Sequence, residues 1–134
     1  MPFVLDASVA ACWLLPDERH PVADAAYERI ATEPATVPPL WWYEMRNLLV
    51  TNERRGRIDG AKTTEALRLL RALPIVVETD VDEADLTTLA RKFRLTVYDA
   101  AYLELARRKG IALATLDAAL AVAARGEAVS LIGA

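Results

Sequence analysis

The segment YDAAYLELARRKGIALATLD, residues 98–117, contains a helix, a stop signal and a strand in direct succession. Apolar residues share one face of the predicted helix, at Tyr98, Ala101, Tyr102, Leu105 and Ala106. A basic run followed by Gly110 is typical of a helix C-terminus. Residues 111–115 are then apolar enough for a buried strand. A helix that leads directly into a buried strand is typical of crossover connections in parallel sheets.

The same alternation extends outward to both ends of the chain. Further strands are predicted at residues 3–5, 35–37, 75–77 and 129–132. Further helices are predicted at residues 8–15, 21–31, 40–55, 59–73 and 117–125, with one more after the acid-rich start at 80–83. The pattern predicts a single domain over residues 1–134. Its fold class is α/β, a three-layer α/β/α sandwich with a mostly parallel sheet of about five strands.

Composition excludes several classes of protein. With 134 residues, 54% of them hydrophobic and 26% charged, the chain is neither disordered nor collagen-like. It contains no apolar run of the ~18 residues that a membrane helix requires. The first residues lack the features of a signal peptide, so we expect a cytoplasmic protein. Cys12 is the only cysteine and His20 the only histidine, which excludes an internal disulfide and a metal site with two histidines.

Acidic residues exceed basic ones by three, 19 against 16, which by itself argues against binding nucleic acid through bulk charge. In an open parallel sheet, ligands collect where strands end. Asp6 ends the first strand, Asp117 follows the strand at 111–115, and Glu44 and Asp99 lie early in their helices. Without these four, the other acidic residues number fifteen, so the rest of the chain is close to neutral.

Each acid also has a purely structural interpretation. Asp6 and Asp117 suit helix N-caps, and Thr96 with Asp99 has the spacing of a capping box. Glu44 suits the positive end of a helix dipole. The acids in the middle or late part of helices are predicted to lie on the surface; these are Glu28, Glu53, Glu65 and Glu104.

Convergence of four carboxylates would have a chemical consequence, because their mutual repulsion requires a cation or raised pKa values. With oxygen donors alone, the cation that fits is Mg²⁺ or Mn²⁺. Such a metal activates water for attack on a phosphodiester. The hydroxyls of Ser8 and Thr115 would orient a carboxylate, a water or a phosphate, or would simply cap helices.

Four segments of the chain resemble, in sequence and in order, the signature blocks of PIN-domain ribonucleases. These segments are residues 3–8, 44–49, 98–106 and 113–117. The resemblance is greatest to the VapC-type toxins of bacterial toxin–antitoxin pairs. The resemblance implies an Mg²⁺- or Mn²⁺-dependent endoribonuclease that dimerises and is inhibited by a cognate antitoxin. It implies catalytic and metal-binding roles for Asp6, Glu44, Asp99 and Asp117. Asn47 matches a frequent polar position near the site. Some relatives carry an acid where this chain has Ala119, which weakens the case for a second metal.

Contacts to macromolecules are expected on two sets of residues. RNA contacts are expected from basic side chains near the acids, namely Arg46, Arg91, Lys92 and Arg94. An apolar docking surface for the antitoxin is expected from Trp13, Trp41, Trp42 and Tyr43. Core or dimer contacts are an equally good interpretation for two of these aromatics.

Two other functions remain open from the sequence. A PIN-like fold could act as a binding module without nuclease activity. A phosphatase-type metal-dependent hydrolase also begins with a strand that ends in aspartate. The haloacid-dehalogenase-like phosphatases carry a second acid two residues later, where this chain has Ser8.

Overall fold

A computed structural model describes residues 1–133 of the chain. The strands are β1 (Phe3–Leu5), β2 (Ala35–Val37), β3 (Ile75–Val77) and β4 (Ala112–Ala114). The helices are α1 (Ala7–Leu14), α2 (Pro21–Ile30), α3 (Pro39–Arg54), α4 (Gly60–Ala72), α5 (Glu83–Phe93), α6 (Val97–Lys109) and α7 (Ala118–Gly126). Every helix of the described range is close to its predicted position.

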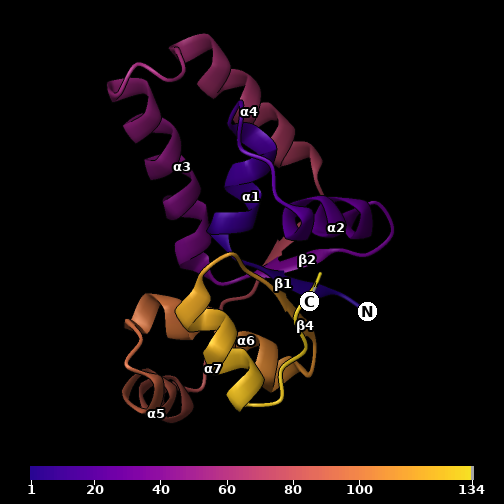
Figure 1. Cartoon of the computed structure of the whole chain (residues 1–134), viewed down its shortest axis with the longest axis vertical. Helices are drawn as coiled ribbons and strands as arrows, with labels where there is room; N and C mark the ends of the chain where they lie inside the picture. Colours follow the sequence, from indigo (N-terminus) through magenta and orange to yellow (C-terminus); the bar gives the residue numbers. More distant parts are fainter. Residues whose placement is uncertain (134) are drawn as a thin grey trace.

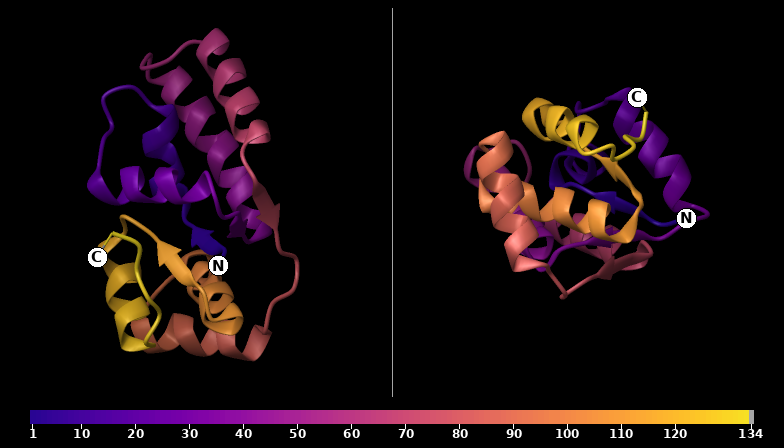
Figure 2. Two further views of the ribbon diagram at one scale, coloured as in Figure 1. Left: turned by 90° about the vertical axis from the view of Figure 1, so that its right-hand side faces the viewer. Right: turned by 90° about the horizontal axis from the view of Figure 1, so that it is seen from below.

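The four strands form one parallel sheet in the order β3-β2-β1-β4. Helices α1 to α4 lie on one side of the sheet and α5 to α7 on the other (Figures 1 and 2). The predicted three-layer α/β/α fold with a parallel sheet is therefore confirmed. From β1 the chain adds β2 and β3 on one side and then returns to place β4 on the other. This reversal puts the topological switch point between β1 and β4.

The predicted strand at residues 129–132 is not formed as a regular strand. In the described part of the chain it makes one isolated bridge, between Leu131 and Leu113. Leu113 N–H donates to Ser130 O at 2.9 Å, and Ile132 N–H donates to Leu113 O at 3.0 Å. Positive φ angles at Ala128 and Gly133, 58° and 76°, bound the segment and leave it too short for a longer ladder.

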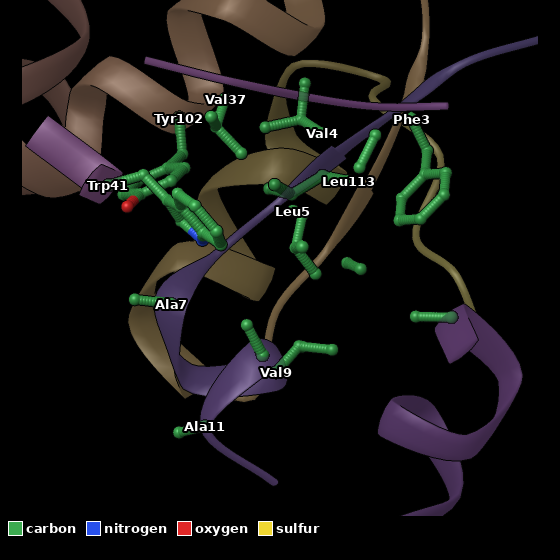
Figure 3. Packing of buried hydrophobic residues seen from close by; sticks show 14 of the residues in the cluster. Phe3, Val4, Leu5, Ala7, Val9, Ala11, Val37, Trp41, Tyr102 and Leu113 are labelled. Carbon is green, nitrogen blue, oxygen red and sulfur yellow. The ribbon is translucent and has the colours of Figure 1, made fainter. Parts of the chain in front are cut away.

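The core is centred on β1, whose residues Phe3, Val4 and Leu5 are fully buried. Figure 3 shows them with Leu113 of β4 and Val37 of β2 in one apolar cluster. A strand covered by helices on both faces has no solvent-facing side, which explains its continuous apolar sequence. Asp6, which directly follows β1, is thereby held in place by a tightly packed strand.

Glu104 corrects a prediction, because it lies in the interior and not on the surface. It is 1% exposed, accepts a hydrogen bond from Asp82 N–H at 3.0 Å and pairs with Arg108 at 2.6 Å. Arg108 also donates to the carbonyl of Asp80 at 2.8 Å. Buried carboxylates require such partners. Glu104 thus ties the loop before α5 to helix α6.

None of the helices within residues 1–133 combines the length and apolar character needed to cross a lipid bilayer.

Candidate functional site

The carboxyl ends of β1 and β4 lie next to each other, and their strand pairing brings Asp6 to the segment after Ala114. Asp6 N–H donates to the carbonyl of Ala114 at 3.0 Å. Helices α3 and α6 carry Glu44 and Asp99. Each of the four predicted acids lies close enough to another to feel its charge: Asp99 acts on Asp6 and Glu44, and Asp117 acts on Asp99.

Asp6 is the most deeply buried of the four acids, with 6% of its surface exposed. Its Oδ2 accepts hydrogen bonds from Ser8 Oγ at 2.8 Å and Thr115 Oγ1 at 2.7 Å. The two hydroxyls in turn accept from Leu116 N–H and Asp117 N–H, each at 3.0 Å. Asp6 makes no side-chain cap of helix α1, so its capping interpretation does not describe this structure. The hydroxyls instead orient the carboxylate, as one of the predicted alternatives stated.

Glu44 is half-buried on α3 and accepts a hydrogen bond from the hydroxyl of Tyr102. Tyr102 lies on α6 and is fully buried. Sequence reasoning placed Tyr102 only on the apolar face of its helix and missed this contact. The available signal was its hydroxyl, because a buried tyrosine usually requires a hydrogen-bond partner.

Asp99 and Asp117 both lie at helix N-termini and are half-buried. Thr96 Oγ1 accepts from Asp99 N–H at 3.1 Å and caps α6. Asp117 Oδ1 accepts from Leu120 N–H at 2.8 Å and caps α7. A cap uses only one carboxylate oxygen, so the capping role of Asp117 leaves its other oxygen for a ligand.

Burial is the main cause that raises the pKa of Asp6, Glu44 and Asp99. The charge of Asp99 raises the pKa of both Asp6 and Glu44 further, and the charge of Asp117 raises the pKa of Asp99. Within residues 1–133, none of the four acids forms an ion pair with lysine or arginine. The cluster therefore carries repulsion that no side chain of the described chain offsets.

The donor set suits a divalent cation. It consists of carboxylate and hydroxyl oxygens, which Mg²⁺ and Mn²⁺ prefer. Within residues 1–133, no three acidic, histidine or cysteine side chains are already drawn together as a metal site. The uncompensated charge around the buried carboxylate nevertheless fits a cation.

The raised pKa values predict that Asp6, Glu44 and Asp99 contribute less to the stability of the metal-free protein as pH rises. A carboxyl whose folded-state pKa is raised stabilises the fold below its unfolded pKa of about 4 and loses that contribution as pH rises through the folded-state pKa. The Glu44→Gln variant lacks this titration, so its free energy of unfolding should rise relative to wild type between about pH 4 and pH 7. Urea unfolding in EDTA measures the difference, and added Mg²⁺ should reduce it. A difference that does not change with pH would contradict the prediction.

A pocket of about 360 Å³ opens beside the acidic cluster. Its lining comes from the start of α1 and from one side of α3: Ala7, Ser8, Glu44, Asn47, Leu48, Thr51, Asn52 and Arg55. The pocket therefore joins two of the predicted site residues, Ser8 and Asn47, to Glu44.

The basic residues predicted to contact RNA do not line this pocket. Arg46 packs its guanidinium on the ring of Trp42, 3.9 Å from the centroid, about 200° around the helix from Glu44. Lys92 pairs with Glu127 at 2.9 Å. Arg91 and Arg94 are exposed at the end of α5, before the helix that carries Asp99.

The four aromatics divide into two pairs. Trp41 is 3% exposed and belongs to the core, and Trp13 is half-buried with its indole N–H on Ala23 O at 2.9 Å. Trp42 and Tyr43 are 46% and 70% exposed and pack edge to face. The second pair is the more exposed of the two, while Trp13 lines a surface pocket between α1 and α2.

The chain has a parallel sheet with acidic residues near its switch point. Comparison with known families assigns it to a class of proteins with this arrangement. The PIN domain family model matches residues 3–126, and the chain belongs to this family. It is similar to Ribonuclease VapC3 of Pyrobaculum aerophilum, with 38% identity over 125 residues that cover 90% of this chain and 93% of that protein. The resemblance inferred from the four sequence segments is confirmed.

Solved structures share the fold. PAE2754 from Pyrobaculum aerophilum has a TM-score of 0.71 and 27% identity, with 92% of this chain and 84% of that chain covered. FitAcB from Neisseria gonorrhoeae has a TM-score of 0.69 at 16% identity, covering 97% and 96%. VapC20 of Mycobacterium tuberculosis, described as a sarcin–ricin loop cleaving toxin, has a TM-score of 0.61 at 19% identity, covering 90% and 94%. At the low sequence identities of the last two structures, the similarity shows a shared fold and nothing about function.

Proposed function

We propose that this protein is a metal-dependent endoribonuclease that hydrolyses RNA phosphodiester bonds. The observation that carries the proposal is the group of four acids around one sheet edge, with no lysine or arginine paired to any of them within residues 1–133. The similarity to Ribonuclease VapC3 supports RNA as the substrate.

In this proposal Asp6, Glu44, Asp99 and Asp117 hold Mg²⁺ or Mn²⁺. A metal held there would supply Lewis-acid chemistry, by polarising a phosphoryl oxygen and lowering the pKa of a water molecule. The chain's own residues prepare the ligands: Ser8 and Thr115 fix one carboxylate of the site through their hydroxyls. Tyr102 fixes Glu44 from the opposite helix. Asn47 lies in the pocket beside Glu44, where its amide is available to orient the substrate.

The test is cleavage of a labelled structured RNA by purified protein. We expect cleavage with Mg²⁺ or Mn²⁺, none with EDTA, and recovery when excess metal is restored. The Asp99→Asn variant should be nearly inactive while unfolding at a similar temperature, because Asp99 is half-buried and its backbone cap is unchanged. Cleavage that persists in EDTA, or an Asp99→Asn variant as active as wild type, would contradict the proposal. A folded protein without any cleavage would favour the binding-module alternative.

We propose further that the protein is the toxin of a toxin–antitoxin pair, that it forms a homodimer, and that a cognate antitoxin inhibits it. The similarity to a VapC protein supports this assignment. The exposed pair of Trp42 and Tyr43 supplies aromatic surface of the kind enriched at protein interfaces.

A further inference from the structure

The pocket beside the acids runs along helix α3, and we call it the α3 groove. Its lining follows one face of α3 at Glu44, Asn47, Leu48 and Thr51, in the pattern i, i+3, i+4, i+7, and reaches the C-cap residue Arg55 at i+11; Asn52 also lines it. Eleven residues of helix correspond to about 16 Å along the axis. The groove thus connects the acidic cluster to Arg55 at the far end of α3, where the helix rises away from the sheet beside α1 (Figure 1).

The polar side chains along the α3 groove are not committed elsewhere. Within residues 1–133, the side chains of Asn47, Thr51 and Arg55 form no hydrogen bond or ion pair with other side chains or backbone. Asn47 and Arg55 are exposed, and Thr51 is half-buried. An amide, a hydroxyl and a guanidinium therefore lie in line from the acids outward, all free to contact a ligand.

The far end of the α3 groove is held rigidly. Asn52 is 6% exposed, donates to the carbonyl of Leu48 at 2.8 Å and accepts from Arg57 at 3.0 Å. Arg57 also pairs with Glu18, in the loop between α1 and α2, at 3.2 Å. Gly56 has a φ of 72°, which allows the chain to turn directly after Arg55. The backbone of Arg55 is consequently fixed relative to the acidic cluster.

We propose that the α3 groove is a subsite for the RNA strand, in which Arg55 binds a backbone phosphate a few nucleotides from the bond that is cleaved. The inference rests on the proposed ribonuclease function. Guanidinium groups are the usual partners of phosphates, and amide and hydroxyl groups suit the sugar 2′-OH and base edges. A pocket of about 360 Å³ is within the size range of small-molecule sites, so it has room for part of an RNA strand.

Arg54 provides a matched control. It precedes Arg55, is also exposed, makes no ion pair within residues 1–133, and does not line the α3 groove. Arg54→Gln and Arg55→Gln therefore remove the same charge from neighbouring positions. Any effect of overall charge should appear in both variants, whereas the loss of a phosphate contact should appear only in Arg55→Gln.

The experiment measures kcat and KM for a single-stranded RNA pool of random sequence, labelled with a fluorophore and a quencher, over a series of salt concentrations. Arg55→Gln should raise KM about tenfold at low salt with little change in kcat, and should reduce the salt slope of log kcat/KM by about 0.7, the loss of one single-strand phosphate contact. Arg54→Gln should leave both values close to wild type. Arg55→Lys should restore much of the salt slope because it keeps the charge.

The outcomes separate this inference from the function on which it rests. Active wild-type enzyme with equal effects of the two Gln variants, or none, would overturn the α3 groove alone. Wild-type protein that cleaves no RNA would overturn both proposals. If Arg55→Gln left RNA kinetics unchanged but weakened inhibition by the antitoxin, the groove would bind a peptide and the RNA subsite would be overturned.

Discussion

Replacing Asp6 by asparagine is expected to lower kcat/KM for RNA cleavage about a hundred- to thousandfold and, at the same time, to stabilise the metal-free protein. The loss of activity follows from removing the charge of the most buried acid in the site. The gain in stability has a separate cause. Burial raises the pKa of Asp6, so its ionised form opposes folding at neutral pH. Asparagine has nearly the same shape, and the hydroxyls of Ser8 and Thr115 can rotate to pair with it.

Both effects are measurable on one preparation. Cleavage of labelled RNA in Mg²⁺ gives the first, and urea unfolding in EDTA gives the second. Expression of the wild type alone should arrest growth, whereas the Asp6→Asn protein should not. Asp80→Asn is the control, because this substitution removes the same charge elsewhere on the protein. The carboxylate of Asp80 is exposed and makes no ion pair within the described residues. If Asp6→Asn strongly destabilised the metal-free protein, Asp6 would be a structural residue and the metal-site proposal would lose its central ligand.

The Leu113→Ala variant should lose about 2–5 kcal/mol of unfolding free energy, the largest stability effect that we predict. Leu113 is fully buried in β4, pairs with Val4 in the sheet and forms the bridge to Leu131. The cavity would open between three segments of backbone, which relax little. The same strand positions Thr115 and Asp117, so activity should fall at temperatures where the folded fraction falls.

Urea unfolding in Mg²⁺-free buffer measures this loss directly. Val122→Ala is the control, since Val122 is 61% exposed on α7 and its truncation should change stability by about 0.5 kcal/mol or less. A Leu113→Ala cost no larger than that of the control would mean that β4 is not part of the stable core.

The fold could be predicted from sequence because its signals are local. Prolines and glycines punctuate the chain, and Phe3–Leu5 and Ile75–Val77 are short apolar runs between helical patterns. The prediction of a strand at residues 129–132 was wrong because the length of that segment depends on the backbone angles at Ala128 and Gly133. An alanine gives no sequence signal of the positive φ that Ala128 adopts. Glu104 was misplaced because α6 packs against the sheet, α5 and α7 and is therefore buried on more than one face.

The candidate site was predictable only in part for a related reason. The four acids follow from the rule that parallel strands end at one edge, which depends on topology and not on side-chain packing. The contact between Tyr102 and Glu44 depends on how α6 packs opposite α3, which no local pattern encodes. The packing of Arg46 on Trp42 likewise depends on the rotamer of a long side chain.

The hydrogen bond from Thr115 to Asp6 joins residues 109 positions apart. Its consequence concerns synthesis on the ribosome. Asp6 is translated 109 positions before its hydroxyl partner Thr115, and β1 can pair with β4 only after β4 has been made. A nascent or truncated chain that stops before residue 117 therefore lacks a complete acidic cluster. The chain cannot assemble the proposed nuclease centre until Asp117 has been translated and β4 has joined the sheet.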